Sequence, residues 1–369
     1  MSDLYIGLMS GTSLDGVDGV LADFSAATPQ VLEHAGRPFH ASLRSELMAL
    51  NTSGTGELHR AALAGNALVR VYAEVVQELL AKARCPASSV IAIGAHGQTV
   101  RHCPQEFDPT GYTLQLNQPA LLAELTGIDI VADFRSRDVA AGGQGAPLAP
   151  FFHQSLFAQP EQAVGVLNIG GISNITLLRP DGPMLGFDCG PGNALMDAWC
   201  QQHLGRDYDS EGAWAAGGRV LVALLERFRS EPYFARTPPK STGRDLFNRA
   251  WLDRQLAEFA QADPRDVQAT LAELTAGACA ADATRYDPHL RRLIVCGGGA
   301  LNSHLMTRLK SLLPQTAVES SALSGLPPLQ VEATAFAWLA RKTVRREKLA
   351  LQSTTGAKGA RVLGCVYPA

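Results

Sequence analysis

Three short runs of small residues, each directly after an apolar stretch, have the composition of phosphate-binding turns. They are Gly11-Thr12-Ser13, Gly170-Gly171-Ile172-Ser173 and Gly297-Gly298-Gly299-Ala300. Small side chains let a backbone approach an anionic ligand closely, and the N–H groups and hydroxyls of such a turn can hold phosphate oxygens. None of the three runs carries a Walker lysine motif or a complete G-x-G-x-x-G pattern. An ordinary tight turn is therefore the alternative at each of the three positions.

Two carboxylates lie close to the first of these turns. The chain continues from Ser13 with Leu14-Asp15-Gly16-Val17-Asp18. Mg²⁺ prefers oxygen ligands and usually shares them with substrate phosphates. Asp15 or Asp18 could therefore lie beside a metal ion. The alternative is a plain hairpin that is closed by an Asp-Gly turn and binds no ligand.

The apolar runs around the first two turns predict two similar hairpins. Residues 4–9 and 17–21 flank the first turn, and residues 164–169 and 175–178 flank the second. A glycine turn between two strands, seen twice about half a chain apart, predicts an internal duplication. Two such hairpin turns, facing each other across a cleft, could hold the phosphates of a nucleotide from both sides. The third turn joins a strand to a helix, where the helix N-terminus favours anions.

The order of the predicted elements indicates an α/β fold in two domains. Strands alternate with helices along the chain, and 369 residues exceed what one core usually holds. The segment 139–150 is rich in Gly, Ala and Pro and is typical of a domain junction. We therefore expect a first domain over 1–138 and a second over 139–344, with the tail 345–369 returning to the first.

Composition argues against several classes of protein. The 32 Lys and Arg residues are balanced by 35 Asp and Glu, for a net charge of −3, so neither nucleic acid nor an anionic membrane is an expected partner. No apolar run reaches the roughly 18 residues of a membrane span, and the N-terminus lacks the pattern of a secretion signal. We therefore expect a cytoplasmic protein. The seven scattered cysteines indicate neither a disulfide framework nor a zinc site.

Several further polar residues could line a binding site. His96 follows a predicted strand over 90–94, and Gln144 lies between glycines of the junction; either could contact a ligand. The guanidinium of Arg135 could bind a carboxylate, and Glu332, at the start of the last helix, could reach a metal-bound water. The alternatives are a buried structural histidine, a linker glutamine, a surface ion pair and a favourable charge in a first helical turn.

Ordered blocks in both halves of the chain resemble one known family. The blocks are MSGTSLDGVD (9–18), GAHGQT (94–99), DFR (133–135), GGQGAPL (142–148), NIGGISN (168–174), GFDCGPGN (186–193) and CGGGA (296–300). Together they are similar to the anhydro-N-acetylmuramic acid kinases, a bacterial family of the actin, Hsp70 and hexokinase superfamily. The resemblance implies a duplicated two-domain actin-like (ribonuclease H-like) fold with a central interdomain cleft.

The same resemblance implies an activity and its cofactors. ATP and Mg²⁺ would serve a reaction in which water opens 1,6-anhydro-N-acetylmuramic acid and phosphate is placed on O6, giving N-acetylmuramic acid 6-phosphate and ADP in cell-wall recycling. The enzyme would be a homodimer. Residues 11–18 match the ATP-binding segment. Residues 168–174, with Asn168, would form the second phosphate turn, and residues 297–300 would lie beside the nucleoside.

Asp188 matches the catalytic aspartate of the family. Its place before a Gly-Pro-Gly turn, at the expected end of a strand, would hold a carboxylate rigidly as the base that takes a proton from water. Arg135 could then bind the lactyl carboxylate of the sugar. Two other interpretations are a conventional sugar kinase, in which Asp188 deprotonates a hydroxyl, and a non-enzymatic actin-like ATPase module.

Overall fold

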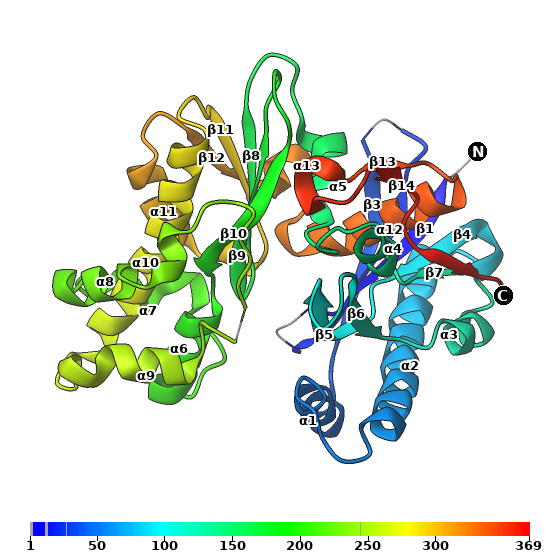
Figure 1. Ribbon diagram of the computed structural model, residues 1–369, viewed down its shortest axis with the longest axis horizontal. Helices are drawn as coiled ribbons and strands as arrows, with labels where there is room; N and C mark the ends of the chain where they lie inside the picture. Colours follow the sequence, from blue (N-terminus) through cyan, green and yellow to red (C-terminus); the bar gives the residue numbers. More distant parts are fainter. Residues whose placement is uncertain (1–2, 12–13, 27, 244) are drawn as a thin grey trace. The chain divides into compact units, whose positions relative to one another are not determined.

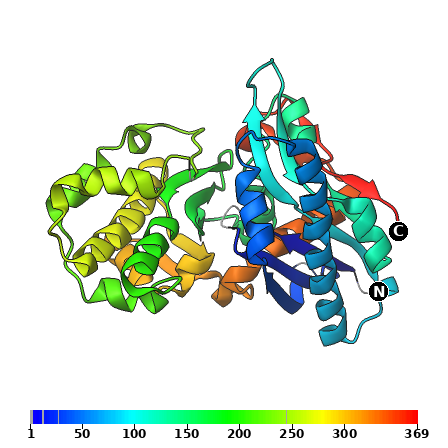
Figure 2. The same cartoon turned by 90° about the horizontal axis from the view of Figure 1, so that it is seen from below.

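The chain folds into two compact units in the computed structural model, which describes residues 3–11, 14–26, 28–243 and 245–369. Unit 1 comprises Met1–Phe152 with Gln330–Ala369, and unit 2 comprises His153–Leu329. Both chain ends therefore belong to unit 1 (Figure 1 and Figure 2). These boundaries differ from the expected ones at 138/139 and 344/345, because residues 139–152 and 330–344 make their contacts within unit 1.

Unit 1 is built on a mixed six-stranded sheet in the order β15-β7-β4-β1-β2-β3. Its strands are β1 (Leu4–Met9), β2 (Gly16–Asp23), β3 (Gln30–Pro38), β4 (Val90–Ala95), β7 (Ile130–Ala132) and β15 (Cys365–Tyr367). Strands β1, β2 and β3 pair antiparallel as a meander, whereas β1 with β4 and β4 with β7 are parallel. Strand β15 brings the tail back to the sheet, antiparallel to β7.

Two long helices cover the two faces of this sheet. Helix α2 (Glu57–Ala83) packs on one face, where Val75 lies 2.4 Å from the position of a Cβ on Gly19. Helix α12 (Val331–Val344) packs on the other face at Gly7 and Gly94. A Cβ on Gly7 would lie 1.9 Å from the Ala333 carbonyl oxygen, so only glycine permits this close approach.

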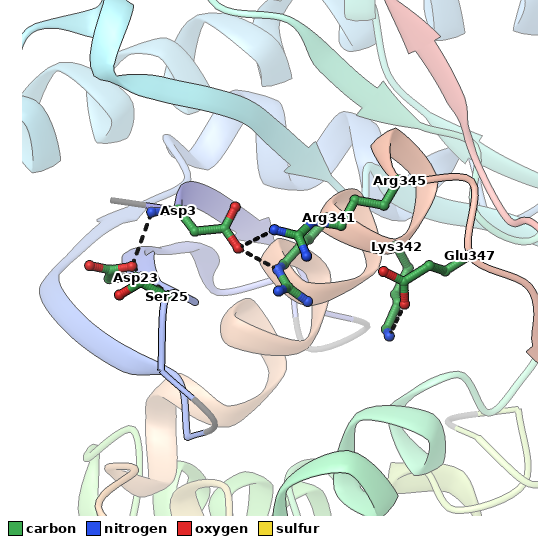
Figure 3. A network of polar contacts seen from close by, with 7 residues as sticks. All are labelled: Asp3, Asp23, Ser25, Arg341, Lys342, Arg345 and Glu347. Atoms are coloured by element: carbon green, nitrogen blue, oxygen red, sulfur yellow. Dashed lines mark hydrogen bonds and ion pairs between the residues drawn. The ribbon is translucent and has the colours of Figure 1, made fainter. Parts of the chain in front are cut away.

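The far end of α12 is tied to the start of the chain (Figure 3). Arg341 Nε and Arg345 each donate to the Asp3 carboxylate at 2.7 Å, and the Asp3 N–H donates to Asp23 at 3.2 Å. Asp3 is buried, so two guanidinium groups and their hydrogen bonds offset the cost of removing its charge from water. The two arginine bonds join residues more than 300 positions apart and so tie α12 to the residue that precedes the first strand.

Unit 2 repeats the strand order of unit 1. Its sheet runs β10-β9-β8-β11-β12, with β8 (Val164–Ile169), β9 (Ile172–Leu178), β10 (Leu185–Pro191), β11 (Arg292–Cys296) and β12 (Ala317–Ser320). Strands β8, β9 and β10 form an antiparallel meander, and β8, β11 and β12 are parallel. The pattern matches β3-β2-β1-β4-β7 strand for strand. The predicted α/β class and the predicted duplication are therefore confirmed.

The core of unit 2 lies between its sheet and a group of helices. The longest is α10 (Pro264–Tyr286), which begins at the Asp263 cap with proline in its first turn. Its buried side chains pack on β9 and β10 and against α11 (Ser303–Leu312). The cleft expected between the units stays a prediction.

The remaining elements complete the two units. They are α1 (Ala41–Ala49), β5 (Gln98–Pro104), β6 (Gly111–Leu116), α3 (Pro119–Thr126), α4 (Ser136–Ala140), α5 (Ala149–Phe157), α6 (Ala194–Leu204), α7 (Ala213–Ala216), α8 (Val222–Arg229), α9 (Arg249–Leu256), β13 (Leu349–Ala350), α13 (Gln352–Thr355) and β14 (Ala360–Arg361). Among the described residues, no helix combines the length and apolar character needed to cross a bilayer.

Candidate functional site

The first glycine turn closes the β1–β2 hairpin of unit 1. Thr12 and Ser13 lie outside the described residues, and the Leu14 N–H donates to the Gly11 carbonyl at 3.2 Å. The turn leads into β2 at Gly16, where a Cβ would lie 2.1 Å from the Arg37 carbonyl oxygen. The predicted hairpin is therefore present, and its last turn residue must be small.

Four of the residues that were expected to bind nucleotide or metal, Leu14, Asp15, Val17 and Asp18, differ in exposure. Leu14 and Val17 are buried in the core of unit 1, so their side chains support the turn and do not reach a ligand. The Asp15 and Asp18 carboxylates are exposed. Arg44 approaches Asp15 at 3.7 Å, and His34 lies 3.3 Å from Asp18.

The carbonyl groups at the start of this turn are held from the loop after β4. His96 Nδ1 lies 3.3 Å from the Ser10 carbonyl oxygen, and the Gln98 amide donates to the Gly11 carbonyl at 3.1 Å. The Ser10 hydroxyl donates to the Gly97 carbonyl and contacts the Tyr72 hydroxyl at 2.9 Å. The block 94–99 therefore positions the turn.

Both ring nitrogens of His96 are engaged within the protein. Because the Ser10 carbonyl can only accept, Nδ1 carries the proton and Nε2 is the acceptor. Arg135 donates to Nε2 through Nε at 3.2 Å and through a terminal nitrogen at 2.9 Å. Burial and the Arg135 charge lower the pKa of His96 to about 3, so the ring is neutral. Both nitrogens of His96 have protein partners in this structure, and the ligand contact expected of His96 stays a prediction.

Arg135 keeps part of its donor capacity. A terminal nitrogen donates to the Gly145 carbonyl at 2.8 Å, and the His96 bonds use Nε and the other terminal nitrogen. One N–H on each terminal nitrogen has no partner among the described residues, since a guanidinium has five N–H groups. Burial lowers the pKa of Arg135 to about 10, with Glu332 and Asp138 acting against that change, so the group stays charged at neutral pH. Surface pairing with Asp133 or Asp138 is absent among the described ion pairs.

The loop that carries Gln144 is fixed by the C-terminal tail. The buried Asp138 carboxylate accepts from the Gly145 N–H and from the Thr355 hydroxyl, both at 2.6 Å. The Gln144 N–H donates to the Thr355 carbonyl at 2.8 Å. The Gln144 side-chain amide makes no hydrogen bond within the described part of the chain. It is therefore held beside Arg135 with its polar group available.

Glu332 lies in the first turn of α12 and is exposed. Desolvation by the surrounding protein and the negative charge of Asp18 raise the pKa of Glu332, and the positive charge of Arg135 lowers it. Asp15, the other predicted metal residue, is not among the groups that shift this pKa. No group of three or more His, Cys, Asp or Glu side chains with metal-binding geometry occurs in the described ranges.

The second and third glycine turns lie together in unit 2. The carbonyl groups of Gly170 and Gly171 accept from the backbone N–H groups of residues 192–194 at 2.7–3.2 Å. Gly297 has a φ of 75°, and a Cβ there would lie 2.4 Å from the Asn168 side-chain oxygen. A Cβ on Gly299 would likewise lie 2.4 Å from the Ile169 side chain. Glycine is therefore required at positions 297 and 299, where the third turn packs against residues 168 and 169.

Asn168 provides an unused polar atom at this junction. It is buried, and its Oδ1 has no hydrogen-bond partner within the described residues. An unpaired buried carbonyl oxygen costs roughly 1–3 kcal/mol, so the position is one that a donor on a ligand could satisfy. A Cβ on Gly298 would lie 3.3 Å from the Asn193 side-chain nitrogen, so position 298 is less crowded than positions 297 and 299.

Asp188 lies inside β10 and not at its end, which corrects the expected strand end near residue 187. The pairing with β9 shifts between Asp188 and Gly190, so Cys189 is an extra residue in a β-bulge. A bulge bends an edge strand and redirects its side chains. The physical reason for the error is that Gly190 and Pro191 continue the pairing, with Gly190 at φ 149°.

The Asp188 carboxylate is half-buried and fixed through one oxygen. Oδ2 accepts from the Ser241 hydroxyl at 2.9 Å and from the Thr242 N–H at 3.0 Å. Oδ1 accepts no hydrogen bond from any described residue. Burial raises the pKa of Asp188, and the two hydrogen bonds and the Lys240 charge act against that increase. One oxygen is therefore free to receive a proton.

Four residues around Asp188 had no assigned role in the sequence. Ser241 and Thr242 belong to the polar segment that follows Pro239. Tyr233 donates to the Asp188 carbonyl at 2.7 Å. Asp282 pairs with Lys240 at 2.8 Å. No sequence signal distinguished Tyr233 or Asp282 from other core residues.

A family model of anhydro-N-acetylmuramic acid kinase matches residues 3–369. A relative from Albidiferax ferrireducens is 63% identical over 389 residues, covering 100% of both chains, and one from Variovorax paradoxus is 65% identical over 372 residues, covering 100% of this chain and 99% of its own. Both are named anhydro-N-acetylmuramic acid kinase. The chain belongs to the anhydro-N-acetylmuramic acid kinase family.

One matching solved structure is much less similar to this chain than these kinases are. The activator of the 2-hydroxyisocaproyl-CoA dehydratase from Clostridium difficile, with bound ADPNP, is 12% identical with a TM-score of 0.49, covering 94% of this chain and 96% of its own. Membership of the anhydro-N-acetylmuramic acid kinase family rests on the family model and on the sequence relatives. It covers the blocks that contain the three turns, Arg135 and Asp188.

Proposed function

We propose that this protein is an ATP-dependent kinase that hydrolytically opens 1,6-anhydro-N-acetylmuramic acid and phosphorylates O6. The products are N-acetylmuramic acid 6-phosphate and ADP, in the recycling of cell-wall sugars. Family membership over the whole chain supports the substrate and the activity. The observation that carries the chemistry is the Asp188 carboxylate, with Oδ2 fixed by two donors and Oδ1 free of described partners.

The proposed reaction needs one base and a positioned phosphoryl group. Asp188 Oδ1 takes a proton from water as the water oxygen bonds to the anomeric carbon. The bond from that carbon to O6 breaks, and O6 takes the γ-phosphoryl group of ATP, so ADP leaves. O6 needs no separate acid, because the phosphoryl group replaces the proton that an ordinary glycosidase would supply. A single carboxylate in a half-buried setting is suited to this role.

Other predicted site residues would bind ATP and the sugar. Gly11 and Gly170 to Gly171 belong to turns whose small residues suit phosphate oxygens. Arg135 has two N–H groups left for a carboxylate, which is the group that the lactyl ether of the sugar presents.

Glu332 and either Asp18 or Asp15 could hold a Mg²⁺ ion. Asp18 is among the charges that raise the pKa of Glu332, and Asp15 is not. Mg²⁺ is commonly held by one or two carboxylates together with substrate phosphates. When bound, the ion would neutralise charge on the transferring phosphoryl group. The cytoplasmic location expected from composition and the homodimer implied by the family resemblance remain part of this proposal.

Turnover in heavy-oxygen water tests the proposal against the conventional sugar kinase. We expect the product from ATP and the anhydro sugar to be heavier than the phosphorylated anhydro sugar by one water, with the label on the anomeric carbon. The reaction is stopped at once, because the anomeric hydroxyl of the product exchanges slowly with solvent. In a control, finished product is incubated in labelled water. A phosphorylated product with its anhydro bridge intact would reject the hydrolytic step.

A further inference from the structure

We propose that Lys240 is a positioning residue for Asp188, acting through its buried ion pair with Asp282 and through its positive charge. The inference rests on the proposed role of Asp188 as the base. It concerns the strap, which we define as residues 240–242. The strap lies along the edge strand β10 and contacts Asp188 at every one of its three residues.

The strap binds both the backbone and the side chain of Asp188. The Asp188 N–H donates to the Lys240 carbonyl at 3.2 Å. The next two residues, Ser241 and Thr242, donate to Oδ2. Strand β10 is the edge of its sheet, so this backbone bond occupies a group that would otherwise lack a strand partner. A displacement of the strap would therefore release the carboxylate.

Lys240 anchors the strap by turning its side chain inward. Its Nζ lies 2.8 Å from Asp282 on α10, and the two side chains are 1% and 8% exposed. The ammonium also lies 5.4 Å from the Phe187 ring centroid and 5.3 Å from that of Tyr233. Both rings flank Asp188, Phe187 in sequence and Tyr233 through its hydrogen bond to the Asp188 carbonyl. The Lys240 ammonium is therefore buried against Asp282 and does not face solvent.

The free energy of folding alone does not explain why the chain buries the Lys240–Asp282 ion pair. Burying two charges costs several kcal/mol per ion, and replacing a buried pair with apolar residues of similar volume is often neutral or stabilising. Lys240 also lowers the pKa of Asp188, against the effect of burial, whereas Asp282 is not among the groups that shift it. The charge therefore helps to keep the base ionised, which an apolar pair could not do.

The decisive variant is the double substitution Lys240→Met with Asp282→Leu. It removes both charges together, so no unpaired buried charge remains to unfold the protein. We expect a melting temperature close to that of the wild type and a kcat at least tenfold lower on the acid limb of the pH profile, with KM for ATP within about twofold. The acid limb of the kcat profile should move up by about one pH unit, since an opposite charge nearby lowers a carboxyl pKa by about 1–3 units.

A matched control removes a second ion pair on the same helix. Arg308 and Glu273 are paired at 2.7 Å, with Glu273 also on α10 and nearly buried. Neither has a hydrogen bond to Asp188 or to the strap among the described contacts. The double variant Arg308→Met with Glu273→Leu should keep the wild-type acid limb, so a general loosening of α10 cannot account for the expected change.

The outcomes separate this inference from the proposed function. A Lys240→Met, Asp282→Leu protein with wild-type kcat and acid limb overturns the inference, as does a fall in kcat with an unmoved acid limb. If that variant does not fold, the single substitution Lys240→Arg replaces it as the test. Arginine keeps the positive charge, so the acid limb of the kcat profile should stay in place. A shift of that limb by about one pH unit overturns the inference. Full activity of Asp188→Asn would instead reject the proposed function itself.

Discussion

At the scale of single residues, one half-buried carboxylate determines the chemistry that we propose. Asp188→Asn keeps an acceptor for Ser241 and Thr242 but cannot take a proton from water. We expect turnover to fall by at least 10²–10⁴-fold, the usual contribution of a positioned base, while the affinity for ATP stays within a fewfold. Turnover and nucleotide titration check this. Asp181→Asn removes the same charge from an exposed loop of unit 2 and should be fully active; loss of activity in both variants would contradict the assignment.

The raised pKa of Asp188 also predicts how pH acts on stability. Burial makes the folded state hold the Asp188 proton more tightly than the unfolded state does. Between the two pKa values the unfolded chain has already lost that proton, so this group's contribution to stability falls as pH rises through that window. Asp188→Asn should therefore be more stable than the wild type at neutral pH, by about 2–4 °C in melting temperature for each kcal/mol gained. Equal melting temperatures at pH 7 would contradict this.

At the scale of elements, unit 1 depends on the close packing of α12 on the sheet. A Cβ on Gly94 would lie 2.1 Å from the Phe336 carbonyl oxygen and 3.1 Å from the Ala340 Cβ. Gly94→Ala should therefore push α12 away and lower the free energy of unfolding by about 1–3 kcal/mol, the usual cost of overpacking. Urea denaturation measures the loss, and hydrogen exchange should locate it in α12.

A second glycine of unit 1 provides the control for this substitution. Gly54 is exposed, and the nearest atom to its Cβ position is the end of the flexible Arg60 side chain at 3.3 Å. Gly54→Ala should therefore change stability by less than about 0.5 kcal/mol, as most surface substitutions do. Similar losses in both variants would show that α12 does not set the space at Gly94.

At the scale of the whole molecule, the two units differ in how the chain builds them. Unit 2 is one continuous segment, and its main core cluster lies entirely within it. Unit 1 needs both ends of the chain, since α12 and β15 follow unit 2 in sequence. We expect the fragment 153–329 to fold alone, with a cooperative thermal transition followed by circular dichroism.

The fragment 1–152 should not fold alone, because it lacks the helix that covers Gly7 and Gly94. Residues 330–369, joined to it by a flexible linker, should restore a cooperative transition. A cooperative, stably folded fragment 1–152 would contradict the part that we assign to α12.

The sequence by itself determined the local framework. Apolar runs and small residues located both hairpins, the third turn and the repeat, because strand and turn preferences are written in neighbouring residues. The blocks around Asp188 and Arg135 were also evident. Thr12 and Ser13 apart, every predicted site residue belongs to the described structure, although the assigned roles of most of them remain proposals.

Only the tertiary structure decided which distant groups meet. The Lys240 side chain turns inward because Asp282, 42 positions away, offers a charge there, and both nitrogens of His96 are used because Ser10 and Arg135 arrive from other elements. The helix after residue 330 joined unit 1 because two glycines of that sheet admit it. Such contacts depend on the packing of whole elements, and no local pattern of residues specifies them.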